Sequence, residues 1–326
     1  MREPSDGMNR RHVERGVLRR VRPRAYNHRM KRLTAPGLAL VAMVVLAMGG
    51  VGRAGEPDNW HVGVRTGVVQ PGDVLRLDIK PPDGVLNVTA TWSERDVPLV
   101  RQGNGTWRGL FGVDVDTAPG EKLLHLRGSR TSGASIEGTH EFVIAAKAVR
   151  TRRIRVNPKF VNPPRSALPR IKEEATLLNA LFSRPPSSER LWTLGAVRPV
   201  EGVAVSGFGV RSILNGAARG PHNGLDLAAG TGTPIHAPTP GIVVYARPFY
   251  FSGNTVILDH GQGLFSTMAH LSVIDVKEGE RVVQGALLGK VGATGRVTGP
   301  HLHWAVRLHG DRVDPLKLIE ALAPAR

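Results

Sequence analysis

The chain has 326 residues and a formal net charge of +17, with 39 glycines, 24 prolines and no cysteine. This length is enough for two domains and a linker, and the many turn-forming residues favour β-structure. The absence of cysteine excludes disulfides, thiolate zinc sites, a cysteine nucleophile and a lipid anchor on cysteine. It does not argue against export, because a large β-core is stable without disulfides.

The positive charge is concentrated at the N-terminus, where residues 1–54 contain 12 basic and three acidic residues. Residues 38–51 are almost wholly apolar and follow two basic residues. This run is shorter than the ~20 residues of a membrane span, so we interpret it as a signal peptide cleaved after Ala54. We hypothesise that translation begins at Met30, which is an ordinary start for such a peptide. An uncleaved membrane anchor is the alternative.

Residues 55–148 are predicted to form a small β-domain. Apolar residues alternate with polar ones from Leu75 to Ile79 and from Leu86 to Trp92, which indicates two half-buried strands. Gly- and Pro-rich turns at regular spacing predict a sandwich of immunoglobulin-like size.

Residues 149–199 are predicted to be a linker with one helix. Residues 150–156 read as a strand with a basic face, and the apolar spacing predicts a helix over 166–182. Ser166 is its expected cap, and Pro169 falls in its first turn. The helix can pack against either neighbouring domain, or cover a cleft, and the sequence does not decide between these arrangements.

Residues 200–326 carry the candidate chemistry. Runs of β-branched and apolar residues at 242–245, 255–258 and 286–288 suit buried strands, and a short helix is expected at 316–323. Zinc in a hydrolase takes two or three imidazole or carboxylate ligands and keeps one position open for water. His222, Asp226 and His303 can supply nitrogen, oxygen and nitrogen, which leaves His270 and His301 as ionisable groups beside the metal.

The spacing of these residues allows them to converge. His301 and His303 are two apart, so on a strand both imidazoles point to the same face. His222 and Asp226 are four apart, but the glycines and proline around them disfavour a helix. We therefore place this pair on a loop that leads into a short strand. Three other histidines, His236, His260 and His309, are interpreted as structural rather than as ligands.

The sequences HNGLD (222–226), AHLS (269–272) and GPHLH (299–303) resemble the three motifs of the lysostaphin/LytM-type zinc metallopeptidases. These are β-rich enzymes that cut peptide bonds in bacterial peptidoglycan. The resemblance covers roughly residues 200–318 and implies a mainly β protein, whose peptidase domain is an antiparallel sheet of the duplicated hybrid motif. Met268 is a departure, because the family often has tyrosine there, and methionine cannot donate a hydrogen bond.

The resemblance also implies the roles of the site residues. His222, Asp226 and His303 would bind one Zn²⁺ per chain, and His270 and His301 would position and deprotonate the water or stabilise the oxyanion. The implied partners are peptidoglycan stem peptides, which carry carboxylates that suit a basic protein. Nucleic acid is not expected, since no stacking platform or recognised motif is present. The implied location is the periplasm or cell envelope, with membrane attachment only if the signal segment stays uncleaved.

Three alternatives stay open at this point. The cleaved bond can be a D-Ala–diaminopimelate cross-link or a glycyl bridge. The domain can instead be a non-catalytic module of the LytM type that binds cell wall or activates an amidase. It can also be a general secreted peptidase that acts on other proteins.

Overall fold

The structure is a computed structural model that describes residues 59–64 and 68–324. All contacts given below lie within the unit Ala54–Arg326. The predicted signal peptide, its cleavage site and the start at Met30 lie outside the described residues. No helix in the described part of the chain is long and apolar enough to cross a bilayer.

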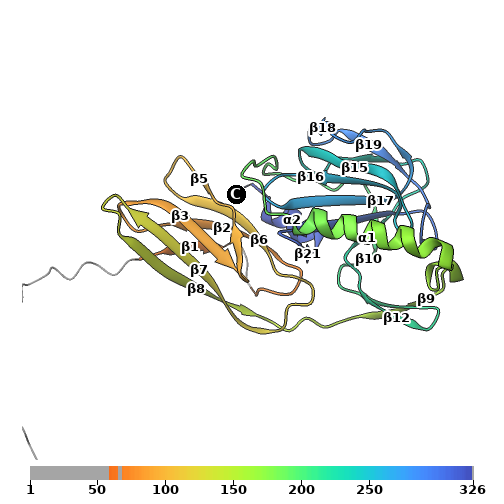
Figure 1. The fold of residues 1–326 in the computed structure, drawn as a ribbon, viewed down its shortest axis with the longest axis horizontal. Helices are drawn as coiled ribbons and strands as arrows, with labels where there is room; N and C mark the ends of the chain where they lie inside the picture. The colour runs from red at the N-terminus through yellow and green to blue at the C-terminus, as the bar shows by residue number, and fades with distance from the viewer. Residues whose placement is uncertain (1–58, 65–67, 325–326) are drawn as a thin grey trace, which may run out of the picture. The chain divides into compact units, whose positions relative to one another are not determined.

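The fold is mainly β, as predicted, and its first part consists of two four-stranded sheets (Figure 1). The strands are β1 (His61–Val64), β2 (Val74–Lys80), β3 (Val85–Trp92), β4 (Arg95–Val97), β5 (Val100–Arg101), β6 (Trp107–Gly112), β7 (Gly120–Arg130) and β8 (Ser135–Ile144). The sheet orders are β1-β2-β6-β5 and β4-β3-β7-β8. Trp92, Phe111 and Phe142 pack in the core with ring centroids 4.6–5.5 Å apart.

The predicted alternation holds in the second half of β3, where Val88, Ala90 and Trp92 are buried. Leu86, which the same alternation placed inside, is 52% exposed. The register between β3 and β7 shifts between Val85 and Asn87, which is the effect of a β-bulge. An irregularity of one residue therefore changes the face to which Leu86 points.

Strand β2 differs from its predicted half-buried pattern because both of its faces are covered. The apolar residues of the alternation are buried as predicted, but Arg76 is also buried, with 4% of its surface exposed. Its Nη1 donates to the carbonyls of Ala321 and Ala323 at 3.3 and 3.0 Å, at the end of α2 (Pro315–Ala321). A cation is favourable there because the last carbonyls of a helix lack partners within the helix.

The rest of the described chain is dominated by a ten-stranded sheet, antiparallel throughout. The remaining strands are β9 (Thr151–Ile154), β10 (Val203–Ser206), β11 (Arg211–Leu214), β12 (Ala217–Pro221), β13 (Gly224–Ala228), β14 (Pro234–His236), β15 (Gly241–Phe249), β16 (Gly253–Asp259), β17 (Leu264–Ile274), β18 (Arg281–Val282), β19 (Leu287–Val291), β20 (Leu302–Leu308) and β21 (Asp311–Val313). The main path of the sheet is β10-β13-β20-β17-β16-β15-β18. The runs predicted as buried strands lie in β15, β16 and the start of β19.

The predicted helix is present as α1 (Leu168–Ser183), which follows the 3₁₀ turns η1 (Pro158–Phe160) and η2 (Arg165–Ala167). The predicted cap is wrong, because Ser166 lies inside η2 and the N-cap is Ala167, which makes no side-chain cap bond. Before these turns, β9 pairs in parallel with β11 in the three-stranded sheet β12-β11-β9.

Helix α1 packs on the ten-stranded sheet, which settles an arrangement that the sequence left open. Leu181 is buried and clusters with Ile257 of β16 and Phe265 of β17, and Figure 1 shows α1 running along β17. Nearer the start of the helix, the carboxylate of Glu174 accepts the backbone N–H of Tyr250 at 2.8 Å. The helix therefore contacts the sheet at two separate points.

His260 follows β16 and is fully buried. Its Nδ1 lies 2.7 Å from the carbonyl oxygen of Pro240, which can only accept, so the ring proton belongs on Nδ1. Burial, opposed by this hydrogen bond, lowers the pKa of His260 to about 4. The unfolded chain takes up a proton near pH 6.5 and the folded chain does not, so stability falls as the pH drops from about 6.5 to about 4.

We expect His260→Asn to weaken this acid sensitivity, because asparagine can donate to Pro240 but does not titrate. The gap in unfolding free energy between the unchanged chain and the variant should shrink by up to about 3 kcal/mol from pH 7 to pH 4. Urea unfolding at both pH values measures this gap. A gap of constant size would contradict the assignment of the buried neutral imidazole.

Candidate metal centre

His222 lies on the connection between two strands, as predicted, whereas Asp226, which was predicted on the same loop, lies within the second strand. Strand β12 ends at Pro221, and β13 carries Asp226. The backbone of His222 is held on both sides, since its N–H donates to Val210 at 2.9 Å and its carbonyl accepts from Gly209 at 2.8 Å. The imidazole therefore projects from a fixed point of the chain.

Gly224 allows β13 to approach its neighbour closely. A Cβ at this position would lie 2.6 Å from the carbonyl oxygen of Trp304 and 2.7 Å from Cε1 of His303. Both distances are shorter than van der Waals contact, so any larger residue would push β13 away from β20. The glycine of the HNGLD sequence thus serves the spacing between Asp226 and His303.

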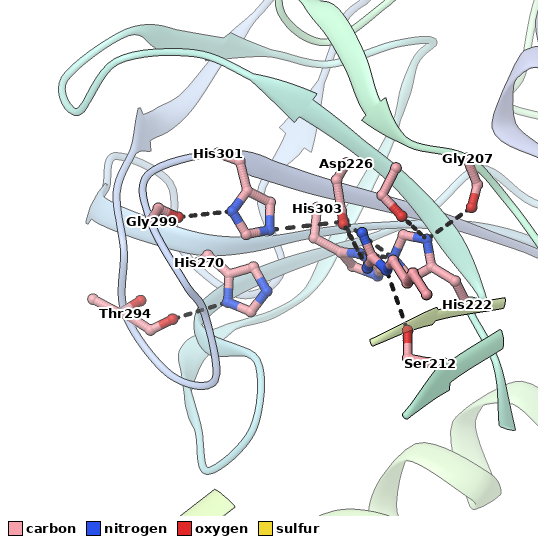
Figure 2. Close-up of polar contacts among 11 residues, drawn as sticks. Gly207, Ser212, His222, Asp226, His270, Thr294, Gly299, His301 and His303 are labelled. Atoms are coloured by element: carbon pink, nitrogen blue, oxygen red, sulfur yellow. Dashed lines mark hydrogen bonds and ion pairs between the residues drawn. The ribbon is translucent and has the colours of Figure 1, made fainter. Parts of the chain in front are cut away.

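Strand pairing brings His303 to Asp226 across 77 residues of sequence. The two residues are direct partners in the antiparallel β13–β20 ladder, so their side chains share one face. Nδ1 of His303 and Nε2 of His222 lie 2.9 and 3.0 Å from the same oxygen, Oδ1 of Asp226 (Figure 2). The two nitrogens are 3.1 Å apart. Ligands around a tetrahedral zinc ion are separated by roughly 3.3 Å, so the three donor atoms have nearly the required spacing.

The outer hydrogen bond of His222 indicates which of its ring nitrogens carries a proton. Its Nδ1 lies 3.1 Å from the carbonyl oxygen of Gly207, which needs a donor, so the proton belongs on Nδ1. Nε2 then presents a lone pair to the carboxylate oxygen of Asp226 at 3.0 Å. Two lone pairs that face each other at this distance need a cation between them, and a divalent metal ion fits this requirement.

His270 and His301 lie beside this group (Figure 2). Their ring centroids are 5.0 Å apart, and that of His270 is 5.9 Å from that of His303. Nδ1 of His270 is 2.8 Å from the carbonyl of Thr294, and Nδ1 of His301 is 2.8 Å from the carbonyl of Gly299. In each ring the proton therefore belongs on Nδ1, which leaves Nε2 as a basic nitrogen.

The backbone of His270 has an unusual conformation, with φ at +69°. Non-glycine residues are uncommon in this left-handed region, and such conformations cluster at functional sites. The N–H of His270 donates to the carbonyl of Ser252 at 2.9 Å, which helps to hold the conformation. The imidazole is thereby directed towards His301 and away from the regular line of β17.

Electrostatics favours a charged carboxylate at Asp226 and the neutral form of the imidazoles of His303 and His270. Burial of Asp226 opposes its ionisation, but the close imidazoles of His222 and His303 outweigh burial and hold the pKa of the carboxyl well below its usual value. Burial lowers the pKa of His303. Burial and the nearby charges of His303 and His301 lower the pKa of His270 to about 3. Neutral imidazole and carboxylate are the forms in which these residues bind metals.

The five residues line a cavity of about 970 Å³, and helix α1 and strand β9 contribute to its wall. Arg152 of β9 was not predicted to have a role, although its strand was predicted to have a basic face. Its Nη2 lies 3.5 Å from Oδ2 of Asp226, and its Nε donates to Oγ of Ser212 at 3.2 Å. The run of arginines at 150–155 is the signal that marks this strand, but its partner across the fold is not visible in the sequence.

The remaining predicted positions lie elsewhere. Met268 is fully buried in the core and does not line the cavity, so the tyrosine common at this position in the family has no polar counterpart here. His236, His260 and His309 also do not line the cavity, in agreement with their structural interpretation. His309 instead lies with Nε2 2.9 Å from the carbonyl of Gln262.

The profile of peptidase family M23 matches residues 220–315, which include all five site residues. A solved structure of a peptidase M23 from Pseudomonas aeruginosa is 35% identical to this chain, with a TM-score of 0.60. That match covers 78% of this chain and 96% of the other. The chain belongs to peptidase family M23. The resemblance to the lysostaphin/LytM-type peptidases and the mainly β fold are thereby confirmed.

Curated relatives of this M23 chain match about a third of it. Peptidoglycan DD-endopeptidase ShyA of Vibrio cholerae is 43% identical over 97 residues, which are 30% of this chain and 23% of that protein. DD-carboxypeptidase/endopeptidase Mpg of Neisseria meningitidis is 40% identical over 97 residues, 30% of this chain and 22% of that protein. The match thus spans less than a quarter of either relative. M23 members are metallopeptidases, and the group of His222, Asp226 and His303 can hold a metal ion.

Proposed function

We propose that this chain is an exported zinc endopeptidase that hydrolyses peptide cross-links of bacterial peptidoglycan. The observation that carries the proposal is the convergence of three donor atoms, from His222, Asp226 and His303, within 4.8 Å of one another. Two further imidazoles, those of His270 and His301, lie next to them. The names of the curated relatives, which act on peptidoglycan, support the substrate class.

In this proposal His222, Asp226 and His303 hold one Zn²⁺. The ion would lower the pKa of a coordinated water towards ~7 and polarise the scissile carbonyl. Nε2 of His270 or His301 takes the proton from the water and later delivers it to the leaving amine. Each of these rings is held by its Nδ1–H bond to a backbone carbonyl, so the basic nitrogen needs no reorientation before it acts.

We also propose the domain division that the sequence indicates, with a β-domain at 55–148, a helical linker at 149–199 and the peptidase domain at 200–326. Two hydrophobic clusters support it, one that contains Trp92 and Phe111 and another that contains Trp304, and Val74 and Leu110 of the β-domain pack in the second. Arg312 of β21 connects the two parts, because its Nη2 lies 2.5 Å from Oδ1 of Asp114 and 2.7 Å from Oδ2 of Asp116.

Incubation of the purified chain with cross-linked muropeptides tests the proposal. We expect cleavage of the cross-link, its loss on treatment with a chelator, and its recovery on addition of Zn²⁺. Mass analysis of the products identifies the cleaved bond. Absence of cleavage by the zinc-loaded chain would favour the non-catalytic module, and cleavage of unrelated peptides at a similar rate would favour a general peptidase.

A further inference from the structure

The cavity beside the site residues has an excess of positive side chains. Its lining includes four arginines and two acids, namely Arg152, Arg219, Arg296, Arg307, Glu174 and Asp226. Both acids are already engaged, Glu174 with Arg170 at 2.7 Å and Asp226 with two imidazoles and Arg152. A concave surface with this charge attracts anionic groups.

Arg296 is held in place at both its backbone and its side chain. Its N–H donates to the carbonyl of Phe251 at 2.8 Å, and its guanidinium lies over the ring of Phe251, 4.8 Å from the centroid. The preceding Gly295 has φ at +75°, and a Cβ there would lie 2.4 Å from the backbone nitrogen of Gly253. A planar cation fixed in this way loses little freedom when it binds an anion.

No carboxylate among residues 59–64 and 68–324 forms an ion pair with Arg296 or Arg219. Arg219 donates to the backbone carbonyl of Val161 at 3.0 Å, which leaves its charge uncompensated. Burial, and then the nearby charge of Arg219, lower the pKa of Arg296. Two neighbouring guanidiniums without an acidic partner form a favourable environment for a carboxylate, which guanidinium can bind through two parallel hydrogen bonds.

The position of Arg296 places this charge beside the candidate chemistry. It lies on the segment that connects β19 to β20, between Thr294 and Gly299. The carbonyls of these two residues hold the imidazoles of His270 and His301. A ligand group at Arg296 is therefore bound by the same segment that orients the two proposed acid–base residues.

We propose that Arg296, supported by Arg219, binds a free carboxylate next to the scissile bond of the substrate. This inference rests on the proposed function, and it predicts which of the two possible cross-links the chain cleaves. In a D-Ala–diaminopimelate cross-link, the carbon that bears the scissile nitrogen also bears a free carboxylate. In a glycyl bridge, the carbon that bears the scissile nitrogen is bonded to the carbonyl of the next amide, so it has no free carboxylate. Arg296 therefore selects for the acidic cross-link.

Comparison of two substrates with two variants tests the inference. The substrates are a D-Ala–diaminopimelate muropeptide dimer and the same dimer with that carboxylate amidated. We expect Arg296→Met to lower kcat/KM on the acidic dimer by about 10- to 100-fold, the usual range for a charged hydrogen-bonded pair. On the amidated dimer, the variant and the unchanged chain should agree within about twofold.

Arg247→Met is the matched control. Arg247 also stacks on an aromatic ring, that of Tyr245 at 4.4 Å, but it pairs with Glu278 and does not line the cavity. We expect this variant to cleave both dimers like the unchanged chain. Equal losses on both dimers with Arg296→Met would show that Arg296 only shapes its segment, and no loss on either would show that it has no role; both results overturn the inference.

A binding measurement separates failure of the inference from failure of the proposed function. Calorimetry with the uncross-linked stem peptide, in its acidic and amidated forms, does not depend on turnover. We expect the zinc-loaded chain to bind the acidic form about tenfold more tightly and Arg296→Met to abolish this preference. If the unchanged chain cleaves neither dimer, the proposed function fails, and equal binding of the two peptides overturns the carboxylate site independently.

Discussion

Replacement of His303 by alanine is expected to remove both the bound zinc and the cleavage of cross-linked muropeptides. His303 contributes one of the three converging donor atoms, and its loss leaves an incomplete ligand set. A metal ion contributes several kcal/mol of transition-state stabilisation, so the rate should fall by at least about 10³-fold. Elemental analysis of the purified variant and a muropeptide assay measure the two effects.

His236→Ala is the control for this change. His236 lies on β14 and does not line the cavity, so zinc content and turnover should stay the same. His303→Ala also removes the contact between His303 and the buried Asp226, which could disturb the fold. Circular dichroism of both variants therefore separates loss of a metal ligand from loss of the fold. A His303→Ala variant that keeps a full complement of zinc would refute its assignment as a ligand.

Replacement of His270 by asparagine is expected to have the opposite profile, with zinc retained and turnover lost. Asparagine tolerates the left-handed backbone conformation found at position 270, and its amide can still donate to the carbonyl of Thr294. The substitution removes the basic Nε2 and leaves the three proposed ligands in place. General acid–base groups contribute about 10²- to 10⁴-fold, so kcat should fall within that range.

Zinc content and kcat measured on the same preparation check this prediction. His270 lies next to the metal group without joining it, so the variant should hold the ion as firmly as the unchanged chain. Loss of zinc together with activity would instead make His270 a ligand. Undiminished turnover would leave His301 as the group that moves the proton.

Much of the local structure follows from short stretches of sequence. The alternation in β3 and the apolar spacing of α1 are properties of adjacent residues, so they predict a strand and a helix without knowledge of the rest. The exceptions have local causes that a pattern does not reveal. A bulge turns Leu86 outwards, and a 3₁₀ turn takes Ser166 out of its capping position.

The candidate site was also largely accessible from the sequence. Residue types that bind metals are few, and their occurrence in three ordered motifs marks His222, Asp226 and His303 as candidates in the sequence alone. The glycine between His222 and Asp226 could be recognised as a breaker of helix. The same glycine, Gly224, also allows the close approach of β13 to His303. This role depends on β20, a strand that is distant in the sequence, since His303 lies 77 residues from Asp226.

The sequence by itself indicated the kind of fold and the candidate metal-binding residues. Only the tertiary structure decided that Arg76 is buried against α2, that α1 and Arg152 line the cavity, and that Arg296 has no acidic partner among the residues that the structure describes. The physical reason is the range of the forces involved. Periodicity and propensity act between neighbours in the chain, whereas burial and charge compensation depend on which distant segments pack together.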